Sequence, residues 1–365
     1  MTRPLIVDAH QDLAWNAQSF GRDITQPLAE RRQRERGSPV VERNGDTLLG
    51  WDCYQDGRVA LVFATLYAAP VRFQVADWEK LVYRDARGAE RLYRGQLDYY
   101  ERLCDEHADK FRLVKDSQAL DEVVAAWEGL TEGQEAAVGL VLLMEGAEAI
   151  RDLGELEEWW QRGLRLIGPA WAGNRFCGGT HEPGPLTDDG RALLDAMAAI
   201  GFALDVSHMD PPAALEAADR YEGLICATHA NAKTLLKGSE SNRHLTDELI
   251  AALLERDAVI GAVPYNLFLH PDWRKGARRE LCSLDMVVDH IDYICQMAGN
   301  ARHAGLGSDF DGGFGLQSVP PELDNLADLQ KLPPLLAARG YSEEDIAAIL
   351  GGNWLRFLRQ FLPAA

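Results

Sequence analysis

Residues 202–229, FALDVSHMDPPAALEAADRYEGLICATH, contain the pattern that decides the fold. Two short apolar runs, Phe202–Val206 and Leu224–Thr228, flank a helical pattern over Pro212–Tyr221. A strand, a helix and a second strand in succession are typical of a parallel sheet whose strands are connected through helices. We therefore expect two neighbouring parallel strands here.

The same alternation runs along the whole chain. Eight apolar runs predict strands, namely Leu5–Asp8, Val59–Leu66, Ala137–Met144, Leu164–Gly168, Phe202–Val206, Leu224–Thr228, Val259–Val263 and His303–Gly307. Helical patterns lie between most of them, at Trp78–Cys104, Leu153–Arg162, Thr187–Ile200, Pro212–Tyr221, Thr246–Arg256 and Leu284–Met297. Thr187 and Gly201 are expected to cap the two ends of the third helix. Eight such repeats in 365 residues favour an α/β fold of the (β/α)8 TIM-barrel type over a doubly wound sheet.

Three stretches interrupt the alternation. Residues 21–57 predict a long insertion after the first strand, and the charge run Glu30–Arg36 within it is expected to be a solvated helix face or loop. Residues 169–186 are rich in Gly and Pro and predict a long loop after the fourth strand. Residues 342–362 predict closing helices. We expect one domain over residues 1–365.

Composition excludes several classes of partner. The chain has 37 Lys+Arg against 57 Asp+Glu, a net charge of −20, so nucleic acid is not expected to bind. The first residues form too short an apolar core for a signal peptide, and the sequence contains no run long enough for a membrane helix. These observations predict a soluble, cytoplasmic protein with no membrane contact. The six cysteines are widely spaced, which favours free thiols over disulfides or zinc clusters.

Imidazole and carboxylate side chains follow five of the predicted strands. They are His10, Asp12, Glu145, His208, His229 and Asp309. The carboxyl ends of barrel strands share one rim, where barrel enzymes place their active sites. Imidazole with carboxylate suits zinc and similar divalent ions, and five ligands exceed what one tetrahedral ion takes. The sequence therefore predicts two metal ions that share a carboxylate.

The motifs in this order resemble those of the membrane (renal) dipeptidase family, a peptidase group of the amidohydrolase-like metal-dependent hydrolases. They cover most of the chain and comprise Asp8–Trp15, Met144–Gly146, Leu186–Leu193, Leu204–His208, Thr228–Ala230, Asn242-Arg243, Gly305–Gly312 and Gly352–Trp354. The resemblance implies a zinc-dependent dipeptidase, acting through a hydroxide that bridges two zinc ions. It further implies a small peptide substrate and tolerance of a D-residue at its C-terminus. A homodimer is a separate expectation for this chain.

The resemblance also assigns roles to individual residues. It implies that His10, Asp12 and Glu145 hold one zinc ion, and that Glu145, His208 and His229 hold the other. Glu145 would bridge the two. Arg243 would bind the terminal carboxylate of the substrate, and Asp309 would carry protons.

One position departs from the family pattern. Dipeptidases of this family usually carry a substrate-facing His after the fourth strand, whereas Trp171 stands there in this chain. An indole donates one hydrogen bond but cannot carry charge. Either the substrate differs, or Arg175 or His181 in the same loop compensates. The alternatives are an amidohydrolase acting on N-acyl amino acids or another small amide, and a metal-binding protein without turnover.

Overall fold

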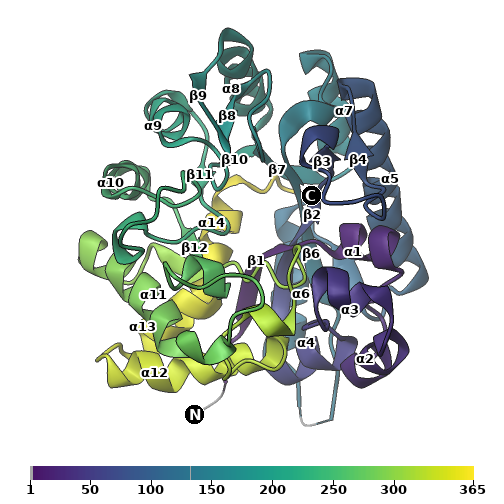
Figure 1. The fold of residues 1–365 in the computed structure, drawn as a ribbon, viewed down its shortest axis with the longest axis vertical. Coiled ribbons are helices and arrows are strands. Elements are labelled where there is room, and N and C mark those ends of the chain that lie inside the picture. Colours follow the sequence, from purple (N-terminus) through teal and green to yellow (C-terminus); the bar gives the residue numbers. More distant parts are fainter. Residues whose placement is uncertain (1–2, 132) are drawn as a thin grey trace.

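Eight parallel strands close into a barrel in the computed structural model, which describes residues 3–131 and 133–365 (Figure 1). The strands are β1 (Ile6–Gln11), β2 (Val59–Leu66), β6 (Val138–Glu145), β7 (Leu164–Gly168), β10 (Ala203–Asp205), β11 (Ile225–Cys226), β12 (Ile260–Ala262) and β13 (Ala304–Leu306). They are neighbours in chain order, and a bridge between Ala227 and Ile260 joins β11 to β12. The predicted (β/α)8 barrel is confirmed.

Every predicted barrel strand is present, because strands that are buried on both faces appear in a sequence as continuous apolar runs. All eight residues of β6 are buried, for example. The structure adds β5 (Phe111–Leu113), which pairs with the start of β6, and two small sheets, β3 (Ala69–Pro70) with β4 (Val82–Tyr83) and β8 (Cys177–Gly179) with β9 (Glu182–Leu186). The pair β8 and β9 lies within the predicted long loop 169–186.

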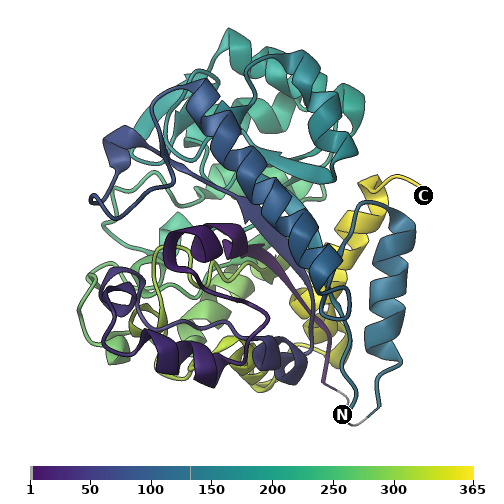
Figure 2. The same cartoon turned by 90° about the vertical axis from the view of Figure 1, so that its right-hand side faces the viewer.

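Helices surround the barrel, and Figure 2 shows the long helix α5 running along the outside of the strands. The α-helices are α1 (Leu13–Phe20), α2 (Leu28–Glu35), α3 (Pro39–Asn44), α4 (Trp51–Gly57), α5 (Ala86–Glu106), α6 (Ser117–Glu128), α7 (Leu156–Gln161), α8 (Asp188–Ile200), α9 (Pro211–Arg220), α10 (Asp247–Glu255), α11 (Leu284–Ala298), α12 (Leu332–Ala338), α13 (Glu343–Ala347) and α14 (Asn353–Phe361). Among the described residues, no helix combines the length and the apolar character needed to span a bilayer.

Capping side chains explain where the helices begin. The Thr187 side chain accepts a hydrogen bond from the Gly190 amide, and Gly201 ends α8 in the left-handed conformation, both as predicted. The helix predicted from residue 78 begins instead at Ala86, because the Asp85 side chain caps it by accepting from the Gly88 amide. Residues 71–83 form a short 3₁₀ turn and β4 in its place.

The charge run 30–36 lies largely in α2 and is only partly solvated. Arg31 and Glu35 are buried, unlike the expected solvated face. Arg31 donates a hydrogen bond to the Leu49 carbonyl, and Glu35 pairs with the equally buried Arg22 at 3.0 Å. Buried charges need such partners, and the sequence pattern alone did not reveal them.

The helix α14 packs against the barrel strands β1 and β13. The Trp354 indole donates a hydrogen bond of 3.0 Å to the Leu306 carbonyl and packs edge-on against Phe63. A Cβ on Gly305 would lie only 2.4 Å from the indole nitrogen, so glycine is required at this position.

Candidate metal centre

The candidate ligands all lie at the carboxyl ends of barrel strands. His10 lies in β1 and Asp12 directly follows it, while Glu145 is the last residue of β6. His208, His229 and Asp309 each lie three residues beyond the ends of β10, β11 and β13. The barrel topology therefore brings all six sequence-predicted residues to one rim.

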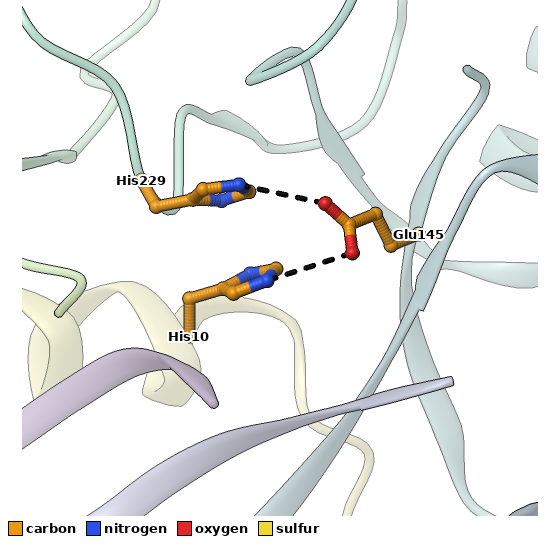
Figure 3. A group of neighbouring side chains, drawn as sticks. All are labelled: His10, Glu145 and His229. Carbon is orange, nitrogen blue, oxygen red and sulfur yellow. Dashed lines mark ion pairs between the residues drawn. The ribbon is translucent and has the colours of Figure 1, made fainter. Parts of the chain in front are cut away.

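The Glu145 carboxylate lies among three imidazoles. Its Oε1 lies 2.9 Å from Nε2 of His208 and 3.5 Å from Nε2 of His229, and its Oε2 lies 3.6 Å from Nε2 of His10. Figure 3 shows His10 and His229 facing opposite oxygens of this carboxylate. The Nε2 atoms of His208 and His229 are 3.0 Å apart. A carboxylate with its two oxygens directed to different imidazoles has the geometry of a bridging ligand.

The candidate ligand atoms form two overlapping groups, and each group is compact enough to hold one metal ion. One group is His10, Glu145 and His229, and the other is His10, Asp12 and Asp309. Both ring nitrogens of His10 are buried and have no hydrogen-bond partner among the described residues. A buried imidazole without a partner is costly, and a metal ion supplies the missing interaction. The donor set of imidazole and carboxylate fits a divalent cation of the zinc type.

Electrostatics favour the ligand forms of Glu145, His208 and His229. Burial would raise the pKa of Glu145, but the three imidazoles, His10 foremost, hold it well below the ordinary value. Burial and Arg243 lower the pKa of His208 to about 4, and burial, His10 and Arg243 lower that of His229. The carboxylate is therefore ionised and both imidazoles are neutral near pH 7.

The cluster also carries an excess of negative charge. Burial and the neighbouring Glu145 raise the pKa of Asp12 to about 6. Against the effect of burial, Glu145, Asp12 and Asp309 raise the pKa of His10 to about 10. Burial, together with Asp12 and Glu145, raises the pKa of Asp309 well above its ordinary value. Neighbouring carboxylates repel one another when all of them are ionised, and a bound cation offsets this repulsion.

Hydroxyl groups orient two of the imidazoles. Thr180 Oγ1 lies 2.8 Å from Nδ1 of His208, and Thr228 Oγ1 lies 2.9 Å from Nδ1 of His229. Thr228 in turn donates to the Asp205 carboxylate at 2.6 Å. Bonds at Nδ1 direct Nε2 into the site, as outer partners do in metal centres. The sequence interpretation missed these residues, although the buried Asp205 at the end of a strand was a signal.

A buried network of hydrogen bonds supports the turn that carries Asp309. Asp309 and Asp311 have φ values of 56° and 66°, and a Cβ on Gly312 would lie 2.0 Å from the Asp309 carboxylate. The Asp311 carboxylate accepts bonds from Thr47 Oγ1 and from the Leu48 amide, the latter at 2.9 Å. The segment 21–57 therefore supports the turn directly.

A cavity of about 730 Å³ opens over Glu145, His208 and Asp309. Arg243 lines it and is buried; its Nη1 and Nη2 each donate at 2.6 Å, to the carbonyls of Ser207 and His229. Its buried Nε has no hydrogen-bond partner in the part of the chain that the structure describes. The guanidinium is thus anchored next to the cluster with donors left for a ligand.

Trp171 also lines this cavity, with its ring 6.1 Å from His208 and 5.4 Å from Tyr67. His181 lines the cavity as well. Arg175 is not among the lining residues, and it donates to the Ile150 carbonyl at 2.7 Å. Of the two residues considered as replacements for the family histidine, His181 is therefore the one placed to act.

The barrel and the residues at its rim define a metal-dependent hydrolase. The profile of the membrane dipeptidase family, peptidase family M19, matches residues 1–364. The chain belongs to this family and is a metallopeptidase, a hydrolase that acts on peptide bonds.

Several known proteins are similar to this chain. An uncharacterized Klebsiella pneumoniae protein encoded in the pqqA 5′ region is 34% identical over 62% of this chain and 83% of that protein. The dipeptidase tcpJ of Claviceps purpurea is 26% identical over 73% of this chain and 59% of its own length. The crystal structure of a Rhodobacter sphaeroides metallopeptidase, liganded with a phosphinate mimic of L-Ala-D-Ala, has the same fold. Its TM-score is 0.77 at 24% identity, over 98% of this chain and 99% of that chain.

Proposed function

We propose that this protein is a zinc-dependent dipeptidase with a binuclear centre. His10, Asp12 and Glu145 would hold one ion, and Glu145, His208 and His229 the other. The observation that carries the proposal is the Glu145 carboxylate, whose two oxygens lie between three imidazoles at the active rim of a barrel. When bound, the ions supply an acidified water and polarise the scissile carbonyl.

Asp309 would move the proton. It lines the cavity, and its Oδ1 lies 3.9 Å from Nε2 of His10. Its pKa is raised by burial and by Asp12 and Glu145, which suits a group that takes up a proton and releases it again. Asp309 would accept the proton of the attacking water and deliver it to the leaving amine.

Arg243 would orient the substrate through its free C-terminus. Two backbone carbonyls fix the guanidinium, so little side-chain freedom is lost when a carboxylate binds. A charged pair at this position favours dipeptides over proteins, because only the last residue of a chain offers the carboxylate. A D-residue at the C-terminus belongs to the proposal, supported by the ligand named for the Rhodobacter sphaeroides structure. We also propose a cytoplasmic location and a homodimer.

Trp171 supports a second candidate, an amidohydrolase of N-acyl amino acids or another small amide. Together with Tyr67 and Phe73 it forms an aromatic wall of the cavity, at ring distances of 5.4 and 5.7 Å. Such a wall suits an apolar acyl group.

Initial rates on matched substrates test the choice. The panel contains L-Ala-L-Ala, L-Ala-D-Ala, L-Ala-L-Ala amide and N-acetyl-L-Ala. We expect the free dipeptides to be hydrolysed fastest. Faster turnover of the N-acetyl compound would favour the second candidate. Stoichiometric metal with no turnover of any substrate would instead indicate a metal-binding protein without turnover.

A further inference from the structure

Three cationic side chains at the mouth of the cavity form no ion pair with any residue that the structure describes. Arg43, Arg274 and Lys275 line the cavity, and no carboxylate of the described residues lies within 4.0 Å of their charged groups. The chain carries 57 acidic and 37 basic residues, so acidic partners are plentiful on its surface. The lining of this cavity in an acidic protein therefore includes three cations that no carboxylate of the described residues neutralises.

The contacts of these cations do not neutralise them. Arg274 donates to the carbonyls of Pro271 and Trp273, at 2.6 and 2.7 Å. Lys275 donates to the Arg43 carbonyl at 3.3 Å, and the Arg43 guanidinium lies over the Trp78 ring at 5.4 Å. The contact between Lys275 and Arg43 also connects the loop after β12 to the end of α3.

The other acidic residues that line the cavity form no ion pair with these cations in the described part of the chain. Glu79 is buried, and its carboxylate accepts a bond of 2.8 Å from the Val75 amide. Glu240 is exposed on the loop after β11, outside the 4.0 Å limit of an ion pair. Asp12, Glu145 and Asp309 belong to the metal centre. The cations thus leave room for an anion supplied by the substrate.

The order of the loops around the barrel places these cations relative to the substrate. Arg243 follows β11, and the next loop around the rim, after β12, carries Phe268 and then Arg274 and Lys275. Phe268 lies beneath the Arg243 guanidinium at 5.2 Å. The aromatic wall of Tyr67 and Trp171 comes from the loops after β2 and β7, in the other half of the barrel. A C-terminal residue held by Arg243 therefore has the cationic loop beside it.

We propose that the cavity selects dipeptides whose C-terminal residue has an acidic side chain, with Arg43, Arg274 and Lys275 as its counter-charges. This inference rests on the proposed dipeptidase function and names its substrate class. A cavity of about 730 Å³ has room for such a side chain in addition to the backbone of a dipeptide. The selection acts through binding, so it lowers KM and leaves kcat nearly unchanged.

Isosteric substrate pairs test the proposal. Ala-Glu is compared with Ala-Gln and Ala-Asp with Ala-Asn, because each pair differs only in charge. We expect kcat/KM to favour the acidic member roughly tenfold, which corresponds to about 1.4 kcal/mol. The preference should shrink between 20 mM and 500 mM salt, because exposed charges are screened.

A double variant, Arg274→Gln with Lys275→Gln, should bring the kcat/KM values for Ala-Glu and Ala-Gln within about twofold of each other. Arg278→Gln is the matched control, since Arg278 is an exposed cation of the same loop that does not line the cavity. It should keep the full preference. Loss of preference in this control would assign the effect to the overall charge and overturn the proposal.

Two further outcomes overturn the inference in distinguishable ways. Equal rates on the paired substrates, with dipeptides still hydrolysed, would refute the acidic selectivity and leave the dipeptidase function intact. If the preference for Glu-Ala over Gln-Ala equals or exceeds that for Ala-Glu over Ala-Gln, the cations contact the N-terminal residue of the substrate, which refutes the proposal. Absence of turnover on every dipeptide would remove the proposed function and this inference together.

Discussion

Replacing Asp311 with Asn should destabilise the protein and slow its reaction. Asp311 does not line the cavity, yet its backbone belongs to the left-handed turn that carries Asp309. Its carboxylate accepts from the Leu48 amide and pairs with Arg22, both of which belong to the segment between β1 and β2. An amide at this position cannot satisfy all of these donors.

The size of the effect follows from the burial of the pair. The side chains of Asp311 and Arg22 are both 0% exposed, with 3.3 Å between Oδ2 and Nη1. Removing one member of a buried ion pair costs about 3–5 kcal/mol. Glu35 still binds Arg22 through two hydrogen bonds of 3.0 Å, so we expect the lower end, about 3 kcal/mol.

Urea unfolding measures the free energy, and steady-state kinetics on a dipeptide measure kcat. Asp324→Asn is the matched control, because its pair with Arg32 spans 3.1 Å but its carboxylate is 59% exposed, so the cost stays below about 1 kcal/mol. For Asp311→Asn we also expect kcat to fall about tenfold or more with metal content retained. A loss below about 1 kcal/mol with an unchanged kcat would refute the supporting role of this network.

The other predictions concern single residues of the cavity. Asp309→Asn should lower kcat roughly 10²-fold while metal analysis shows the same content, and a higher KM at constant kcat would contradict the proton role. Arg243→Ala should cost a few kcal/mol in kcat/KM for free dipeptides and remove the discrimination against C-terminal amides, unless the native enzyme already hydrolyses both equally. Trp171→His should change the ratios of kcat/KM over a dipeptide set with little change in Tm; unchanged ratios with a lower Tm would mean that the indole only packs. Burial and Arg243 lower the pKa of His244 from 6.5 to about 3, so the neutral ring contributes stability above pH 6.5 that is lost as the pH falls toward 3. Between pH 7 and pH 5 this amounts to about 2 kcal/mol in urea unfolding, and His244→Asn should lose less stability over that interval than the native protein does.

The barrel could be predicted because its strands are buried on both faces and form apolar runs. Elements outside the barrel carry a weaker signal. The strand β5 has three residues, of which Arg112 is exposed, and it pairs only with the start of β6. The helix α6 follows β5, which is not a barrel strand. The pattern of eight alternating strands and helices therefore did not predict α6.

The candidate site was visible for a similar reason. His208, His229 and Asp309 each stand just after an apolar run, where a polar residue is conspicuous. Arg22 gave no such signal, because its importance depends on a contact with Asp311, which is far away in the sequence. The charges at the mouth, such as Lys275, are ordinary surface residues until the loops bring them to one cavity.

The central claim is that Glu145 joins two metal ions in one catalytic centre. Elemental analysis of the purified protein, together with hydrolysis of a dipeptide library by the same samples, tests it most directly. We predict close to two zinc ions per chain in the native protein, and weakened binding of both ions with loss of hydrolysis in Glu145→Gln. A Glu145→Gln protein that retains two tightly bound ions would contradict the bridging role on which the account rests.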